Sequence, residues 1–298
     1  MIRIAVFPKA YLEALADGSM DLMEWIGQAG TLGADGLEMY PAFFRSFDGA
    51  YLQRVEQAAR AARLAIPMMC SSPDFTHPDP RFRERECGTM RRLMDVMAAI
   101  GPDDFRSCRV LSGQRRPEVE RADGVRWTVE SIRALLPYAE QRRVHLVMEN
   151  HYKDGFWQYP EFAQASDIFF EIVEQIDSPW FGVNFDPSNA LVAGEEPLAV
   201  MDRALPRIRT MHASDRSLAE GFTLDDLRRH TGAGYSQGLV HGVIGRGLND
   251  YGAIFDRLRR ARFSGWISIE DGMNGLEDMR ESVAFLRAQA AARAEAAE

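Results

Sequence analysis

The sequence contains few cysteines, and none of them form a pair that could hold a structural zinc ion. Cys70, Cys87 and Cys108 lie far apart, and no CxxC spacing occurs. This spacing argues against a thiolate zinc site. An odd, sparse set of cysteines suits reduced thiols better than a disulfide framework. We therefore expect a cytoplasmic protein.

Long apolar runs and an excess of positive charge are also absent. No run of about eighteen apolar residues occurs, and no stretch of signal-peptide length precedes Pro8. The net charge is −9, and arginine greatly outnumbers lysine. An acidic chain is a poor non-specific ligand for nucleic acid or anionic membranes. We expect neither as a partner.

Short apolar runs alternate with amphipathic helical segments along the whole chain. This alternation is typical of an α/β protein with a parallel sheet, and eight such units favour a closed (β/α)8 TIM barrel. Such barrels use a chain of this length as one domain, so we predict a single domain over residues 1–298. The predicted strands cover residues 2–7, 35–40, 65–71, 105–113, 144–150, 181–186, 208–215 and 265–271.

Two segments depart from the simple repeat. Residues 216–248, between the seventh and eighth predicted strands, are too rich in glycine for one helix, and we expect an inserted loop there. Residues 277–298 predict a closing helix with a frayed tail. The alternative fold is an open doubly wound sheet, but the G-x-G-x-x-G that often follows its first strand is missing.

The last four predicted strands end in ionisable residues, which are Glu149, Asp186, His212 and Glu270. In a barrel these ends line the mouth of the active site. Each residue alone has a simpler explanation; Asp186, for example, could cap the helix that begins at Pro187. Together, the four groups would repel one another unless a cation lay among them. Oxygen and nitrogen ligands suit Mn²⁺, Mg²⁺, Co²⁺ or Zn²⁺, so the pattern predicts a metal site.

The segments VMENH, NFDPSN, MHASD and ISIED, all within residues 144–275, resemble the metal-binding strand ends of the xylose-isomerase-like TIM-barrel superfamily. That superfamily includes sugar phosphate isomerases and epimerases such as D-tagatose 3-epimerases. Inosose dehydratases, 3-dehydroshikimate dehydratases and C-glycoside deglycosidases also belong to it. The resemblance implies one divalent cation, most often Mn²⁺, held by Glu149, Asp186, His212 and Glu270. It also implies a homo-oligomer or an assembly with a partner subunit.

The resemblance further implies a sugar isomerase or epimerase that removes a proton next to a carbonyl, through a metal-stabilised enediolate. Glu149 and Glu270 match the two catalytic carboxylates of the epimerases. His151 departs from the epimerase pattern and looks more like the lyase members, which perform β-elimination on a keto-sugar or cyclic keto-polyol. His151 is either an acid/base or a residue that orients Glu149 or a water molecule. Both reactions stay open at this point.

Several residues outside the metal shell are candidate contacts for a small sugar or keto-sugar. Trp157 lies in an aromatic loop that could pack on a substrate, a neighbouring subunit or the protein's own helices. Few lysines lie near the strand ends, which favours a non-phosphorylated substrate, although the glycines at 245 and 247 could bind a phosphate. The full set of predicted contacts is Arg216, His241, Arg246, Asn189 and Trp157.

Two other classes of protein are less consistent with the sequence. Abasic-site endonucleases share the barrel, but they use a histidine-rich cluster of three metals and a basic groove. This chain has six histidines and a negative net charge. A non-catalytic binding barrel is disfavoured because residues of every required ligand type are present.

Overall fold

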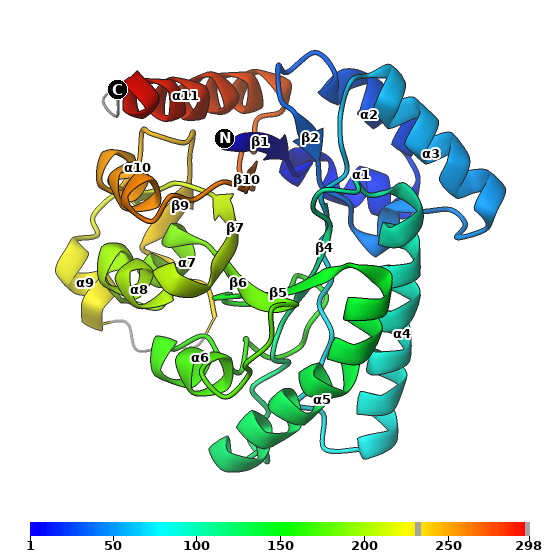
Figure 1. Cartoon of the computed structure of the whole chain (residues 1–298). Coiled ribbons are helices and arrows are strands. Elements are labelled where there is room, and N and C mark those ends of the chain that lie inside the picture. The colour runs from blue at the N-terminus through cyan, green and yellow to red at the C-terminus, as the bar shows by residue number, and fades with distance from the viewer. Residues whose placement is uncertain (230–233, 296–298) are drawn as a thin grey trace.

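A closed barrel of parallel strands forms the centre of the molecule, with helices around it (Figure 1). The structure is a computed structural model that describes residues 1–229 and 234–295. Eight strands pair in the order β2-β1-β10-β7-β6-β5-β4-β3, and every pair in this sheet is parallel. Parallel bridges from Gly36 to Ala65 and from Met39 to Met69 join the two outer strands and close the barrel.

The eight predicted strands are all present, but each is shorter than its apolar run. The shortest, β2 and β3, have two residues each, because isolated bridges replace a continuous ladder where the barrel closes. The strands are β1 (Arg3–Val6), β2 (Gly36–Leu37), β3 (Met68–Met69), β4 (Ser107–Val110), β5 (His145–Glu149), β6 (Phe181–Phe185), β7 (Ile208–Ala213) and β10 (Trp266–Ile269).

Helices follow the strands, and aspartates cap the start of several of them. Asp48 accepts a hydrogen bond from the backbone N–H of Tyr51, and Asp250 accepts one from Ala253. The α-helices are α1 (Leu12–Asp17), α2 (Leu22–Ala29), α3 (Gly49–Ala61), α4 (Pro80–Ile100), α5 (Arg121–Arg142), α6 (Ser166–Val173), α7 (Pro187–Val192), α8 (Pro197–Ala204), α10 (Tyr251–Arg260) and α11 (Leu276–Glu295); short 3-10 turns are η1 (Lys9–Tyr11), η2 (Pro41–Phe43) and η3 (Leu205–Arg207).

The insertion predicted at residues 216–248 is a small antiparallel hairpin with one short helix. Its strands are β8 (Arg216–Leu218) and β9 (Leu239–His241), and α9 (Leu224–Arg229) lies between them in sequence. The segment for which we predict a closing helix, residues 277–298, contains all but the first residue of α11, and residues 296–298 of the predicted frayed tail lie outside the described residues. No helix in the described part of the chain is long and apolar enough to cross a membrane.

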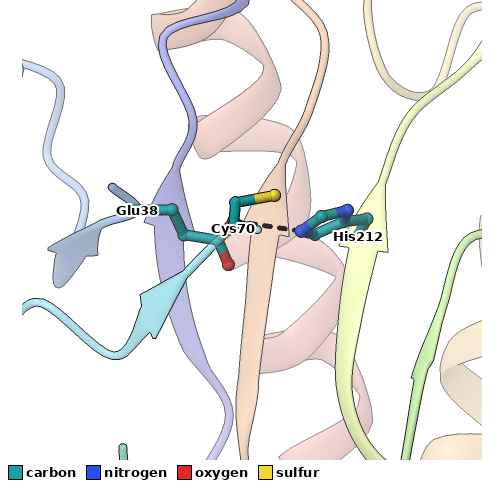
Figure 2. A group of neighbouring side chains, drawn as sticks. All are labelled: Glu38, Cys70 and His212. Carbon is teal, nitrogen blue, oxygen red and sulfur yellow. Dashed lines mark hydrogen bonds and ion pairs between the residues drawn. The ribbon is translucent and has the colours of Figure 1, made fainter. Parts of the chain in front are cut away.

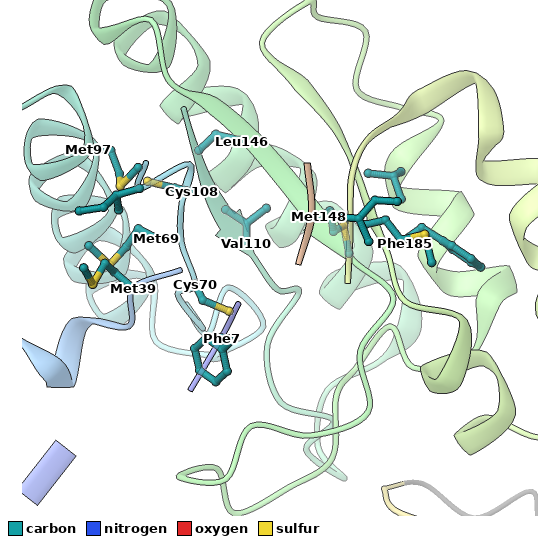
Figure 3. Close-up of a cluster of buried hydrophobic side chains, with 14 of the residues drawn as sticks. Phe7, Met39, Met69, Cys70, Met97, Cys108, Val110, Leu146, Met148 and Phe185 are labelled. Atoms are coloured by element: carbon teal, nitrogen blue, oxygen red, sulfur yellow. The ribbon is translucent and has the colours of Figure 1, made fainter. Parts of the chain in front are cut away.

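The strands place apolar side chains against the helices and polar ones inside the barrel. Cys108 and Val110 of β4 and Leu146 and Met148 of β5 belong to the main hydrophobic core, together with Met97 of α4 (Figure 3). Because side chains alternate along a strand, the intervening residues point into the barrel. This alternation directs the polar end of β5 toward the barrel mouth.

Gly36 lies where the barrel closes, and a methyl group would not fit there. An added Cβ would lie 2.8 Å from the carbonyl oxygen of Ala65 and 2.8 Å from the Trp266 ring. We expect Gly36→Ala to lower the free energy of unfolding by about 1–3 kcal/mol, measured by urea denaturation. The matched control is Gly27→Ala in α2, where nothing lies within 4 Å of the added atom. Equal unfolding free energies for the two variants would contradict this account of the barrel closure.

Candidate metal centre

Four residues from neighbouring strand ends form one compact group, which we call the ligand cluster: Glu149, Asp186, His212 and Glu270. Glu149 ends β5, His212 lies in β7, and the other two directly follow β6 and β10. One ligating atom of each residue lies within 4.8 Å of those of the other three, and all four side chains are buried. The structure therefore brings together the four residues predicted as ligands.

His212 lies between three carboxylates. Its Nδ1 is 3.1 Å from Glu149 Oε1 and 3.3 Å from Glu270 Oε2. Its Nε2 is 3.0 Å from Oε2 of Glu38, which directly follows β2. Burial works to lower the pKa of His212, but the three carboxylates together raise it well above its ordinary value. The contacts direct Nδ1 toward the ligand cluster and leave Nε2 to Glu38.

Glu149 is held by partners at both of its oxygens. Oε2 accepts a hydrogen bond of 2.7 Å from the buried Arg109 guanidinium of β4, and Oε1 accepts one of 3.1 Å from the Asn189 amide. Burial works to raise the pKa of Glu149, but His212 and Arg109 overcome it and lower that pKa to about 2. The carboxylate is therefore ionised, with Oε1 turned toward His212.

Glu270 has a similar arrangement on the other side of His212. Its Oε1 lies 3.3 Å from Nζ of Lys9, and its Oε2 contacts His212. Burial opposes ionisation, but Lys9 and His212 hold the pKa of Glu270 well below its usual range. Each glutamate thus has one oxygen on a cationic side chain and one beside the imidazole.

Asp186 combines the cap that its sequence position suggested with a place in the ligand cluster. Oδ1 accepts hydrogen bonds from the backbone N–H groups of Ser188 and Asn189 and so caps α7. The Ser214 hydroxyl donates to both carboxylate oxygens, and the Asn150 side chain binds the Asp186 backbone on both sides. Burial, reinforced by Glu149, raises the pKa of Asp186 to about 7 against the lowering effect of Arg216.

The ligand cluster fits one divalent cation. It offers three carboxylates and one imidazole and no sulfur, which is the donor set of Mn²⁺, Mg²⁺, Co²⁺ and catalytic Zn²⁺ sites. The ligating atoms of the three carboxylates lie close together, and Glu149 and Glu270 add to the burial that raises the pKa of Asp186. A cation among the carboxylates would offset their repulsion.

Sequence reasoning missed the residues that support the ligand cluster. Glu38 orients His212, and the Ser268 hydroxyl donates a hydrogen bond to Oε1 of Glu38. Glu38, Cys70 and His212 form a second close group (Figure 2). Glu38 lies inside the strand predicted over residues 35–40, so the strand-end rule did not identify it. In the structure β2 ends at Leu37, which places Glu38 at the strand end. Lys9 and Arg109 gave no comparable signal, because their roles depend on partners far away in sequence.

His151 is buried beside a carboxyl group that the sequence did not single out. Glu161 Oε1 accepts hydrogen bonds from the backbone N–H and the hydroxyl of Ser112. Glu161 Oε2 and His151 Nδ1 lie 3.9 Å apart, and neither has a hydrogen-bond partner among the described residues. Burial lowers the pKa of His151 to about 4, against the effect of Glu149, and raises that of Glu161 to about 8. Both side chains are therefore uncharged at neutral pH.

Three of the five predicted substrate contacts lie beside the ligand cluster or beside residues that adjoin it. Asn189 binds Glu149 directly, and Arg216 donates to Ser214, the residue that binds Asp186. His241 of β9 lies 2.9 Å from Asp271, which follows Glu270 in sequence.

Trp157 and Arg246 lie further from the ligand cluster. Trp157 lines a pocket beside Tyr40, Ser72 and Asp154, and Ser72 accepts a hydrogen bond from Arg109. Arg246 is exposed and pairs with Glu281 of α11, so this geometry gives its predicted substrate contact no support.

The glycines considered for phosphate binding are already occupied. The backbone N–H groups of Gly245 and Gly247 both donate to Oδ2 of Asp215, each over 2.9 Å. Asn249 donates its backbone N–H to the other oxygen of the same carboxylate. This turn fastens the end of the insertion to the end of β7 and does not leave its amides free for a phosphate.

The chain belongs to the xylose isomerase-like TIM barrel family, whose model matches residues 26–289. The family and the single-domain barrel predicted from the sequence are thereby confirmed.

Two relatives show how the chain compares in sequence. A 3-oxo-isoapionate decarboxylase from Pectobacterium atrosepticum is 30% identical over 173 residues, which cover 57% of this chain and 50% of that protein. An inosose dehydratase from Bacillus thuringiensis is 25% identical over 135 residues, or 44% of this chain and 42% of that protein. The matches thus span about half the length of these relatives.

Solved structures share the fold at lower identity. A D-tagatose 3-epimerase-like protein has a TM-score of 0.75 and 16% identity, covering 99% of this chain and 100% of that one. A 3-keto-D-glucoside 4-epimerase from E. coli has a TM-score of 0.70 and 15% identity, covering 97% and 100%. At these sequence identities, the similarities show a shared barrel fold.

Glu161 generates a pH-dependent prediction. Its pKa of about 8 in the folded chain lies above the ordinary value of 4.5. Its contribution to stability is therefore complete below pH 4.5 and is lost as the pH rises toward 8. Relative to Glu161→Gln, the wild type should lose unfolding free energy on the order of a few kcal/mol between about pH 5 and 8. Urea denaturation of both proteins across this range measures it, and a pH-independent difference would contradict it.

Proposed function

We propose that this protein is a divalent-metal-dependent isomerase or epimerase that moves a proton at the carbon next to the carbonyl of a sugar or keto-sugar. The observation that carries the proposal is the pair of glutamates at one centre. Glu149 and Glu270 both contact Nδ1 of His212, and each has its other oxygen on a cationic side chain. Two carboxylates so placed can remove a proton and return one.

The ligand cluster would hold the cation, and the resemblance to the xylose-isomerase-like superfamily favours Mn²⁺ among the candidates. When bound, a divalent cation supplies Lewis-acid polarisation of a carbonyl, which acidifies the neighbouring C–H bond. Arg109 and Lys9 fix the positions of the two glutamates, and Glu38 fixes the ring of His212. The Arg109 and Glu38 contacts are buried, and the Lys9 contact is nearly so, which keeps the carboxylates from rotating freely.

A lyase on the same site is the second candidate, and His151 favours it. The imidazole lies two residues beyond Glu149 and is buried and uncharged. Its Nδ1 has no hydrogen-bond partner among the described residues. A neutral imidazole can accept a proton or, once charged, protonate a leaving group, as β-elimination requires. The relatives include a dehydratase and a decarboxylase, and the similar structures include an epimerase-like protein. Both the lyase and the epimerase reaction are therefore compatible with these similarities.

The two reactions are separated by incubating Mn²⁺-loaded protein in D₂O with ketohexoses, 3-keto-glycosides and cyclic keto-polyols. Proton NMR should show deuterium next to the carbonyl and inversion or carbonyl migration for an isomerase or epimerase. A new alkene or a released aglycone would establish the lyase instead. Absence of both from the metal-loaded protein would overturn the proposed function.

The metal assignment predicts a specific loss of binding. His212→Ala should reduce bound Mn²⁺, measured by elemental analysis after dialysis, because it removes the nitrogen ligand. Glu149→Gln and Glu270→Gln should abolish turnover. Each should also lower the unfolding free energy, because it leaves Arg109 or Lys9 without its carboxylate partner. The contrary outcome is a His212→Ala protein that retains the full wild-type metal content.

His151 can be separated from the metal shell by its own variant. His151→Ala should retain Mn²⁺ and lose turnover by roughly 10²-fold or more if the imidazole transfers a proton. The matched control is His145→Ala, at the other end of β5, where the ring stacks beside Phe105 and Trp180. Unchanged turnover in His151→Ala would limit this residue to orienting its neighbours.

A further inference from the structure

Arg216, at the start of the inserted hairpin, is a buried cation without a carboxylate partner, and its Nε–H has no hydrogen-bond acceptor among the described residues. Only 2% of the residue is exposed. Its guanidinium carbon lies 5.6 Å from the ring centroids of both Tyr152 and Tyr235. Nη1 reaches Ser214 Oγ over a long 3.4 Å, and Nε has no hydrogen-bond partner among the described residues. The Tyr235 side chain also takes part in a hydrogen bond with Arg216. A guanidinium has five N–H donors, so these two contacts do not use all of them.

The other two cations of the site differ from Arg216 because each has a carboxylate partner. Lys9 pairs with Glu270 over 3.3 Å, and Arg109 pairs with Glu149 over 2.7 Å. No salt bridge joins Arg216 to a carboxylate anywhere in residues 1–229 or 234–295. A buried charge without a partner is costly, so this exception calls for an explanation.

The nearest acidic groups are engaged elsewhere. Asp271 accepts a hydrogen bond from the Asp215 backbone over 2.6 Å and contacts His241 over 2.9 Å. Asp186 caps α7 and is a proposed metal ligand, so a bound cation would take up its charge. Burial works to lower the pKa of Arg216, but Asp186 and other neighbours keep it above its ordinary value, so the guanidinium stays charged.

We propose that Arg216 is the anion-binding residue of this site and that the substrate carries a carboxylate, making it a keto-sugar acid. The two tyrosine rings lie against the guanidinium, and a planar, two-oxygen ligand could accept the N–H groups that have no acceptor in the protein. Sugar hydroxyls could accept these hydrogen bonds but would leave the buried positive charge unpaired. The inference rests on the proposed function, since it takes the ligand cluster as the place where a keto-sugar binds.

A carboxylate fits better than a phosphate. A phosphate dianion is usually bound by several backbone N–H groups or by clustered cations. The N–H groups of Gly245 and Gly247 already bind Asp215, and Lys9 is committed to Glu270. One guanidinium therefore remains, which matches a single negative charge.

The test compares two ligands that differ at one carbon. 2-Keto-D-gluconate carries a carboxylate where D-fructose carries a hydroxymethyl group. Isothermal titration of Mn²⁺-loaded wild type should give a Kd at least about tenfold lower for the acid. Arg216→Met should abolish this preference, so that the Kd for the keto acid rises to that for D-fructose. The matched control is Arg228→Met, because Arg228 lies in the same insertion but is 65% exposed and pairs with Asp225.

Several results of these titrations would overturn the proposal. Equal Kd values in the wild type, no binding of the keto acid, or a preference that survives in Arg216→Met would overturn the proposal. Tighter binding of fructose 6-phosphate than of the keto acid would overturn the carboxylate assignment. If Arg216→Met does not fold, Arg216→Lys, which keeps the charge but not the planar fork, should retain only part of the preference.

The anion site and the proposed function can fail separately. A chain that binds no Mn²⁺ would refute the proposed function, and the ratio of the two Kd values can still be measured on that metal-free sample. A metal-loaded chain that exchanges the α-proton of D-fructose but shows no carboxylate preference would refute only the anion site.

Discussion

The mutual repulsion of three buried carboxylates around one imidazole is the constraint on which the rest of the site depends. Glu149, Asp186 and Glu270 converge with His212 because parallel strands of a closed barrel present their carboxyl ends at one edge. Ionised groups this close are tolerable only where cations or hydrogen-bond donors offset them. Arg109 and Lys9 do so at the outer oxygens, and a bound divalent cation would do so at the centre.

The fold supplies this arrangement with rigid supports. Alternate residues of β4 and β5 belong to the hydrophobic core, where Cys108 lies beside Met97 of α4 and Met148 lies beside Phe185 of β6 (Figure 3), and this packing fixes the strands. The polar residues between them are then held in the barrel by hydrogen bonds from neighbouring strands. The inserted hairpin adds Arg216 and His241 to the same mouth, and Asp215 fastens the end of the insertion. The side chains of the ligand cluster and those of the hydrophobic core thus lie on opposite faces of the same strands.

The sequence predicted the eight strands and the four clustered residues because both follow a local rule: an apolar run that ends in an ionisable group. It overestimated strand length, since an apolar run does not show where ladder pairing ends, as at β2 and β3. Arg109 was hidden inside a predicted strand and Glu161 in a loop, and their partners lie 40 and 49 residues away in sequence. Arg246 was predicted as a substrate contact, but its side chain is exposed and pairs with Glu281. Long-range pairing of this kind has no periodic signal in one sequence.

The central claim is that Nδ1 of His212 and three carboxylates hold one divalent cation. The most direct measurement is pulsed electron paramagnetic resonance of Mn²⁺ bound to protein containing ¹⁵N-labelled histidine. The account predicts one bound Mn²⁺ per chain with hyperfine coupling to a single imidazole nitrogen, and loss of that coupling in His212→Ala. Bound Mn²⁺ without nitrogen coupling, or with coupling that persists in His212→Ala, would contradict it.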